Sequence, residues 1–437
     1  MRTDSMGFIQ HIPGTQPVVP PERDPKAKGI GVLGLHEGRT LMIATATRCA
    51  HAYPAAGCDL SEEKLAASRE ELPDCFYTTS YEAMLARPEV DIVAIYTPDA
   101  MHAEHIEQAF EAGKDVICTK PIVNSLEHAA RILKAGRRTG RKLLVGQSTR
   151  FFEPFRRQRA DLEAGHFGGL EGVELVDAHY IHRMDWYYRK SPWAATDTDW
   201  AFLGMSHPVD LVRWYLGRIV EVTAHGRKSQ MGAQFGLKGN DIYIASFRAE
   251  DGRIGRAMGH YGCHELPRAR NCIELMLYGT EGSSLAQYHD MRYVHSGRDA
   301  ETERRRDGVE GSGEGSARAR SDRPASSAPG SATSSLSHSV SPSLPGTFAP
   351  GEMAEVVEDY LYAGRHYYFG SEVHGMHYGE FANYAEHFAR ALIEGRDASP
   401  GLEEGVETYC VMEAMKRSAD AGGKPVEVAP LLREVGL

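Results

Sequence analysis

The stretch Asp91–Pro121, DIVAIYTPDAMHAEHIEQAFEAGKDVICTKP, decides the fold. Ile92–Tyr96 is a continuous apolar run of strand length, which is typical of a strand buried on both faces of a parallel sheet. The turn Thr97–Asp99 breaks this run, a helix of about 13 residues follows, and Asp115–Cys118 is the next short strand. Lys120 lies just past that strand, at the sheet edge where open α/β proteins bind ligands. We therefore expect Lys120 to take part in chemistry.

The same alternation of strand and helix fills residues 28–150. Four more apolar runs of strand length are separated from the opening stretch and from each other by helical segments: Ile30–Leu33, Pro54–Cys58, Cys75–Thr78 and Lys142–Gly146. Six strands alternating with helices predict an α/β fold, a Rossmann-type doubly wound parallel sheet.

A glycine-containing turn, GLHEGR, follows the first strand at residues 34–39, and Asp59 stands 25 positions after Gly34. Open N–H groups at a helix start hold a pyrophosphate, and a carboxylate at this distance bonds the ribose hydroxyls of a dinucleotide. Because a carboxylate repels a 2′-phosphate, Asp59 favours NAD over NADP. The match to the G-x-G-x-x-G fingerprint of dinucleotide-binding turns is imperfect. Counted from Gly34, His36 and Arg39 stand at the second and third glycine positions, and Gly38 is displaced by one. A generic tight turn is the alternative interpretation.

Beyond residue 150 the pattern changes to longer alternating segments joined by short turns. The tight turn Asp251-Gly252 joins two of them, and a helix over Phe202–Leu216 is stopped by Gly217. These features predict an α+β domain over residues 151–437 with an open, mostly antiparallel sheet. Its expected strands are Val173–His182, Val220–Ser229, Asp241–Ala249, Ile254–Tyr261 and Ile273–Tyr278.

Two segments do not have the composition of a packed core. Residues 1–27 are a Pro-rich leader, which we expect to be a flexible arm. Residues 299–350 are rich in Ser, Gly, Pro, Ala and Arg, and we expect a disordered insertion in a surface loop. Helices are expected to follow over Glu380–Glu394 and Glu403–Ala421.

The bulk composition excludes several classes of protein. The net charge of −11 argues against a nucleic-acid-binding surface. Seven scattered cysteines without a CxxC pair indicate free thiols, and no tetrahedral ligand set predicts a metal. The N-terminus has no signal-peptide core, and no apolar run approaches the roughly 20 residues that span a bilayer. We expect a cytoplasmic protein without membrane partners.

Several motifs resemble the glucose–fructose oxidoreductase, inositol dehydrogenase and MocA (Gfo/Idh/MocA) family over nearly the whole chain apart from the leader and the insertion. They are GLHEGR at 34–39, YTPDAMH at 96–102, EAGKDVICTKP at 111–121, VGQSTRFF at 145–152 and SHPVDLVRWYLG at 206–217. The resemblance implies a Rossmann domain beside an open-faced α+β domain, bound NAD(P), and oxidation or reduction of a secondary alcohol on a sugar or cyclitol. It also implies a homo-oligomer, a dimer or tetramer, built through the open sheet.

The resemblance also implies site residues. Lys120 matches the active-site lysine, and His207 matches the histidine that takes the alcohol proton. Relatives often carry an aspartate four residues before that histidine, but this chain has Leu203, and Asp210 is the nearest carboxylate on that face.

We expect the cofactor to contact Gly34, His36, Glu37, Gly38, Arg39, Asp59, Thr97, Pro98, Asp99, His102, Lys120, Pro121, Gln147 and Arg150. We expect the substrate to contact Lys120, Tyr180, His182, Arg183, Trp186, His207 and Asp210, and we also considered His374 and His377. For His102 a packing or capping role is the alternative, and for His182, His374 and His377 it is a surface position.

The leading hypothesis is a NAD-dependent oxidoreductase that transfers hydride between nicotinamide and a secondary hydroxyl of a sugar, glycoside or cyclitol. One rival is a non-catalytic NAD-sensing regulator of the same fold. A third hypothesis is an enzyme that uses bound NAD transiently to cleave or isomerise a glycoside.

Overall fold

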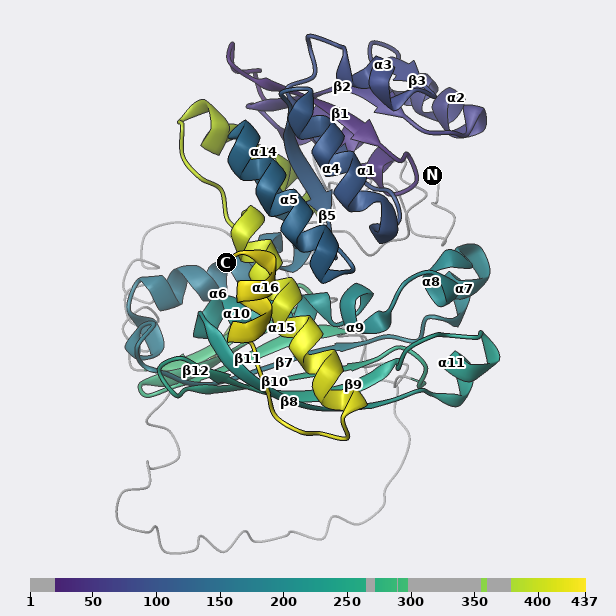
Figure 1. The fold of residues 1–437 in the computed structure, drawn as a ribbon. Coiled ribbons are helices and arrows are strands. Elements are labelled where there is room, and N and C mark those ends of the chain that lie inside the picture. The colour runs from purple at the N-terminus through teal and green to yellow at the C-terminus, as the bar shows by residue number, and fades with distance from the viewer. Residues whose placement is uncertain (1–19, 265–271, 289, 298–354, 360–378) are drawn as a thin grey trace, which may run out of the picture.

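The computed structural model describes residues 20–264, 272–288, 290–297, 355–359 and 379–437, and two sheets organise them (Figure 1). The expected insertion at 299–350, residues 1–19 of the expected leader, and both His374 and His377 lie outside these residues.

The first sheet is parallel and has the strand order β3-β2-β1-β4-β5-β6. This order is that of a doubly wound dinucleotide-binding sheet, with its switch point between β1 and β4. All four residues of β4 are buried, as its apolar run predicted. The predicted α/β class is confirmed. The strands are β1 (Lys28–Leu33), β2 (Ala52–Cys58), β3 (Phe76–Thr78), β4 (Ile92–Ile95), β5 (Asp115–Thr119) and β6 (Leu143–Gly146).

Side-chain caps fix where the helices of this sheet begin. Ser61, Ser80 and Ser125 each accept a hydrogen bond from the backbone N–H three residues later, which satisfies one free donor of the first turn. Gly140, with φ of 65°, ends α5. The helices are α1 (Gly38–Arg48), α2 (Glu62–Glu71), α3 (Tyr81–Leu85), α4 (His102–Glu111) and α5 (Leu126–Thr139).

The second sheet has nine strands in the order β14-β13-β12-β11-β7-β10-β9-β8-β15. Its neighbours pair antiparallel except β10 with β7, so the mostly antiparallel sheet is confirmed. Strands β12, β13, β14 and β15 were not predicted, because they are short and less apolar than the others. The strands are β7 (Val173–Ile181), β8 (Ile219–Arg227), β9 (Ile242–Ala249), β10 (Ile254–His260), β11 (Ile273–Gly279), β12 (Gly282–Gln287), β13 (Arg292–Gly297), β14 (Glu355–Asp359) and β15 (Val426–Glu427).

Helices pack on one side of the second sheet, where α10 (Ser206–Leu216) contacts β7 and α15 (Leu402–Asp420) contacts β8 (Figure 1). The single helix predicted over 202–216 is wrong, since α9 (Trp200–Leu203) ends before α10 begins. Between them, the ring of Tyr261 packs so closely on Gly204 that a Cβ there would lie 2.3 Å from it. Three more helices of this part of the chain are α6 (Glu153–Glu163), α7 (Asp185–Lys190) and α8 (Trp193–Thr196).

The C-terminal segment returns to the first sheet. Helix α14 (Glu380–Ile393) packs beside α1, where Cys49 Sγ donates to the carbonyl of Ala382 at 3.4 Å and the His51 N–H donates to Glu386 at 3.0 Å. Helix α15 then contacts α5 and β6 of the first sheet as well as β8 of the second. Chain far from the first 150 residues therefore completes the packing around the parallel sheet.

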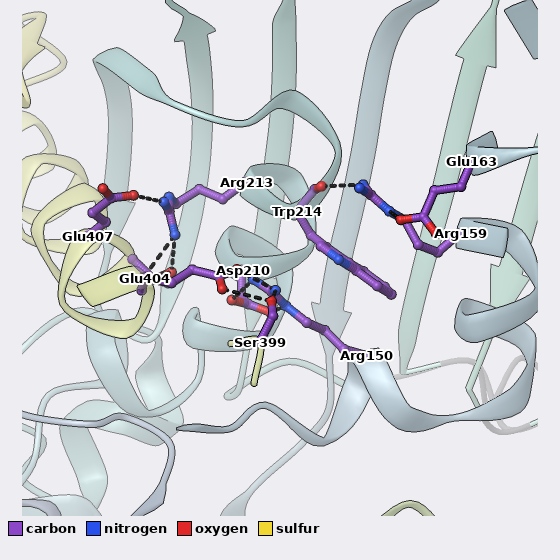
Figure 2. Close-up of polar contacts among 10 residues, drawn as sticks. Arg150, Arg159, Glu163, Asp210, Arg213, Trp214, Ser399, Glu404 and Glu407 are labelled. Atoms are coloured by element: carbon purple, nitrogen blue, oxygen red, sulfur yellow. Dashed lines mark hydrogen bonds and ion pairs between the residues drawn. The ribbon is translucent and has the colours of Figure 1, made fainter. Parts of the chain in front are cut away.

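A buried ion-pair group joins the two sheets (Figure 2). Arg150, which follows β6, donates from Nε and Nη2 to Asp210 of α10, both at 2.7 Å, and from Nη1 to Glu404 of α15 at 2.5 Å. Ser399 donates to the second oxygen of Glu404 at 2.8 Å. Although burial opposes its charge, the two carboxylates raise the pKa of Arg150. Arg150 thus stays a cation that holds three elements together.

Removing one partner from this group should leave a buried charge poorly compensated. We expect Asp210→Ala to lower the free energy of unfolding by about 3 kcal/mol or more, as measured by urea denaturation. Glu403→Ala is the matched control, because Glu403 pairs with Arg137 at 2.8 Å in an exposed pair, and it should change stability by less than about 1 kcal/mol. Equal losses in the two variants would contradict a structural role for the buried group.

Candidate active site

A cleft of about 770 Å3 opens at the carboxyl ends of the parallel strands. The loops after β1, β4 and β5 form one wall, and residues of the second sheet and its helices form the opposite wall. Helix α14 adds Phe381 and Tyr384. Ligands of doubly wound proteins bind at this edge, next to the switch point.

The glycine turn at 34–39 is built to bring backbone close to a ligand. Gly34 has a φ of +94°, and a Cβ on it would lie 2.8 Å from the carbonyl oxygen of Tyr96. A Cβ on Gly38 would lie 2.5 Å from Val32, so Gly38 allows α1 to pack tightly on β1 despite its displaced position. His36 and Glu37 line the cleft beside the start of α1. This cradle of small residues and helix-start N–H groups fits a pyrophosphate.

Asp59 fixes the same turn from the end of β2. Its Oδ2 accepts the backbone N–H of Leu35 at 2.8 Å, and its Oδ1 accepts that of Ser61 at 2.9 Å. Lys64 pairs with Asp59 at 3.2 Å. Asp59 lines the cleft, so its carboxylate lies where the ribose of a dinucleotide bound at the turn would reach.

His102 ties together the two loops at the other end of the cleft. Its Nε2 contacts the carbonyl oxygen of Thr97 at 2.8 Å, and its Nδ1 contacts that of Pro121 at 2.9 Å. His102 lines the cleft but is buried. Its contacts with two backbone carbonyls fit the alternative packing role better than the expected contact with a cofactor.

Lys120 reaches across the cleft to the second wall. Its Nζ donates to the main-chain carbonyl of Leu203 at 3.0 Å, and Ser206 Oγ donates to the same oxygen at 3.2 Å. Burial lowers the pKa of Lys120 to about 8, while Glu37 and Asp99 oppose that shift. Lys120 is therefore mainly an ammonium at neutral pH, yet it loses its proton far more readily than an exposed lysine.

His207 lies four residues after Leu203, in the first turn of α10. It is buried, lines the cleft, and packs edge-to-face on Tyr180 with ring centroids 5.3 Å apart. Leu203 therefore connects Lys120 directly to the segment that carries His207. A cationic proton donor and an imidazole converge at one end of the cleft.

A second polar contact crosses the cleft nearby. Thr198 donates to Asp99 Oδ2 at 2.5 Å, and both side chains are buried. The segment between β7 and Thr198 folds into α7 and α8 and lines the cleft with Trp186, Tyr187 and Trp193. This aromatic segment therefore faces the loop after β4.

Most of the predicted site residues line this cleft. They are Gly34, His36, Glu37, Asp59, Thr97, Pro98, Asp99, His102, Lys120, Pro121, Tyr180, Trp186 and His207.

Other predicted residues are not among the described cleft-lining residues. Arg150 and Asp210 bind each other in the buried group of Figure 2, so the predictions of cofactor and substrate contact do not fit their position. Arg39 pairs with Glu71 at 2.6 Å, and Arg183 pairs with Asp185 at 2.9 Å. Arg39 and Arg150 pair with carboxylates 32 and 60 residues away, which sequence spacing does not predict, whereas Arg183 pairs with a carboxylate two residues on. Gly38, Gln147 and His182 also lie outside the lining.

Sequence reasoning missed the contribution of α14. Phe381 packs edge-to-face on Tyr96, and the hydroxyl of Tyr384 hydrogen-bonds that of Tyr96. The aromatic spacing of Phe381, Tyr384 and Phe388 marked a buried helix face, but no local signal placed that face beside the glycine turn.

The described residues show neither a metal site nor a membrane-spanning helix. They contain no group of three or more His, Cys, Asp or Glu side chains placed to hold a metal ion. None of the described helices is long and apolar enough to cross a membrane.

Two family models match consecutive stretches of the chain. One, described as an oxidoreductase family with an NAD-binding Rossmann fold, matches residues 28–147. The C-terminal domain model of the same family matches residues 155–284.

Curated relatives match in part. A 1-carboxy-3-chloro-3,4-dihydroxycyclohexa-1,5-diene dehydrogenase of Comamonas testosteroni is 29% identical over 201 residues, 45% of this chain and 49% of the relative. Inositol 2-dehydrogenase 2 of Saccharopolyspora erythraea is 30% identical over 199 residues, 45% of this chain and 55% of the relative. The chain thus spans about half the length of the curated relatives it matches.

Solved structures share the fold. An oxidoreductase from Agrobacterium radiobacter in complex with NAD+, L-tartaric acid and magnesium superposes with a TM-score of 0.68 at 17% identity, covering 93% of this chain and 99% of the other. A levoglucosan dehydrogenase in complex with NADH and levoglucosan gives 0.68 at 18% identity, covering 92% and 99%.

Proposed function

Because the chain belongs to the Gfo/Idh/MocA family of oxidoreductases, we propose that it is a NAD-dependent dehydrogenase of a secondary hydroxyl on a sugar, glycoside or cyclitol. The observation that carries the proposal is that Lys120 and His207 line one cleft with the glycine turn and Asp59. The names of the matched relatives, an inositol dehydrogenase and a dihydroxycyclohexadiene dehydrogenase, are consistent with a ring alcohol as substrate.

The residues of the first wall would hold the dinucleotide. The N–H groups at the start of α1 would bind the pyrophosphate, and Asp59 would bind the adenosine ribose and exclude a 2′-phosphate. The loops Thr97–Asp99 and Lys120–Pro121 would then face the nicotinamide, which accepts hydride from the carbinol carbon when bound.

Two side chains would handle the proton and the oxygen of the alcohol. His207 would take the hydroxyl proton, because a histidine accepts protons near neutral pH. Lys120, mainly an ammonium at neutral pH, would donate a hydrogen bond to the substrate oxygen and stabilise the charge that develops there.

The rival hypotheses differ in what becomes of NADH. A dehydrogenase accumulates NADH with a polyol or glycoside, which absorbance records directly. An enzyme that uses NAD transiently forms product without net NADH, and a regulator does neither. The convergence of Lys120 and His207 on the cleft favours catalysis over the regulator.

Replacing either residue should abolish turnover without loss of cofactor. We expect Lys120→Met and His207→Ala each to lower kcat/KM for NAD reduction by about 10²-fold or more, with NAD binding by fluorescence little changed. Lys134→Met, on the exposed face of α5, is the control and should behave as wild type. Full turnover in both site variants would contradict the proposed roles.

The pH dependence tests the same roles. Above the Lys120 pKa of about 8 the ammonium is lost, so kcat/KM for alcohol oxidation should fall about tenfold per pH unit. In Lys120→Arg the cation persists, and this alkaline decline should disappear. A decline that is identical in both proteins would assign the titration to another group.

Asp59 should set the choice of cofactor. We expect wild type to bind NAD at least about 10-fold more tightly than NADP, because the carboxylate repels the 2′-phosphate. Asp59→Asn should bring the ratio of the two dissociation constants close to one, as measured by titration calorimetry. Asp74→Asn makes the same change of charge at an exposed position and should keep the ratio. An unchanged ratio in Asp59→Asn would refute this assignment.

We also propose that the face of the second sheet opposite the described helices forms a homo-oligomer. Four large apolar side chains there are 40–53% exposed: Ile244, Ile254, Tyr278 and Val357. Exposed apolar groups of this kind mark association surfaces. Light scattering should show a dimer or tetramer for wild type and a smaller species for Ile244→Glu/Ile254→Glu, whereas Leu170→Glu should keep the wild-type mass. A monomeric wild type would rule the interface out.

A further inference from the structure

Leu203 has two different groups at the end of the cleft that holds Lys120, a main-chain carbonyl and an apolar side chain. Its carbonyl oxygen accepts the hydrogen bond from Lys120 Nζ at 3.0 Å. The residue also lines the cleft, is only 8% exposed and belongs to the apolar core. It precedes His207 by four residues, and Ser206, next to His207, donates to the same carbonyl oxygen at 3.2 Å.

Other residues that line the same cleft also offer carbon atoms to a ligand. Trp200 lines the cleft on the same short helix, and its indole N–H already donates to the carbonyl of Ala194 at 2.9 Å, so its ring offers only carbon to a ligand. Phe152 and Tyr288 pack edge-to-face with centroids 4.5 Å apart and line the cleft as well, next to Ile273 in the lining.

We propose that Leu203 sets substrate selectivity, and that the substrate is a ring alcohol with an apolar edge, in which a carbon flanking the reacting carbon carries no hydroxyl. This inference rests on the proposed function and deepens it by naming the substrate class. Deoxycyclitols, deoxysugars and hydroaromatic diols share this chemistry.

The physical reason is desolvation. A hydroxyl pressed against Leu203 gives up its hydrogen bonds to water and gains none, whereas a CH2 group gives up nothing and gains dispersion contacts. A hydrophobic wall discriminates against an added hydroxyl by about 10²-fold at most. We therefore expect wild type to favour the deoxygenated ring by about 10- to 100-fold in kcat/KM.

The two groups of Leu203 can be tested separately, because a side-chain substitution keeps the main-chain carbonyl that positions Lys120. Leu203→Asn is close in size and offers hydrogen bonds to a substrate hydroxyl without adding charge beside the ammonium. Leu203→Met keeps an apolar wall of similar volume and is the matched control.

The experiment compares initial rates of NADH formation with myo-inositol and with deoxyinositols that lack one hydroxyl. Wild type and Leu203→Met should prefer a deoxyinositol by about 10- to 100-fold, and Leu203→Asn should bring the ratio close to one or reverse it. A ratio of two substrates on one preparation does not depend on the fraction of folded enzyme, so a general loss of stability leaves it unchanged.

The wild-type ratio is informative even if Leu203→Asn does not fold. Equal or better use of myo-inositol by wild type, or a ratio unmoved in a folded Leu203→Asn, overturns the inference while NADH formation upholds the proposed function. Absence of NADH with every alcohol in wild type overturns the proposed function and this inference with it.

Discussion

The hydrogen bond from Lys120 to the carbonyl of Leu203 is the contact on which the site depends. It is the middle one of three polar contacts that follow one another along the edge of the parallel sheet. The loops after three adjacent parallel strands, β4, β5 and β6, each place one polar side chain against the chain segment between β7 and β8. Their partners follow in the same order along the α8–α10 segment. The three contacts are Asp99 with Thr198, Lys120 with Leu203, and Arg150 with Asp210.

The two outer contacts of this series join pairs of buried side chains, and the middle one joins a lysine side chain to a main-chain carbonyl. Arg150 and Asp210 satisfy each other in the interior, and Asp99 and Thr198 are buried together. Lys120 instead donates to a neutral carbonyl, and burial leaves it with a lowered pKa. The ammonium of Lys120 has three N–H donors, so it can donate further hydrogen bonds beside the one to Leu203.

Sequence patterns predicted those structural features that depend on residues close together in the chain. The parallel strands and the position of Lys120 at the end of β5 both followed from residues close in sequence. Contacts between segments that are far apart in the sequence could not be predicted in this way. The use of Arg150 as an ion-pair partner and the approach of α14 to Tyr96 depend on how the two sheets dock, which no periodicity encodes.

A crystal structure with NAD+ bound tests the central claim most directly, because it needs no knowledge of the substrate. We expect the adenosine ribose at Asp59, the pyrophosphate at the start of α1, and the nicotinamide C4 facing the space between Lys120 and His207, with the Lys120–Leu203 contact retained or exchanged for a ligand oxygen. A dinucleotide bound elsewhere, or a nicotinamide that lies away from Lys120 and His207, would contradict it.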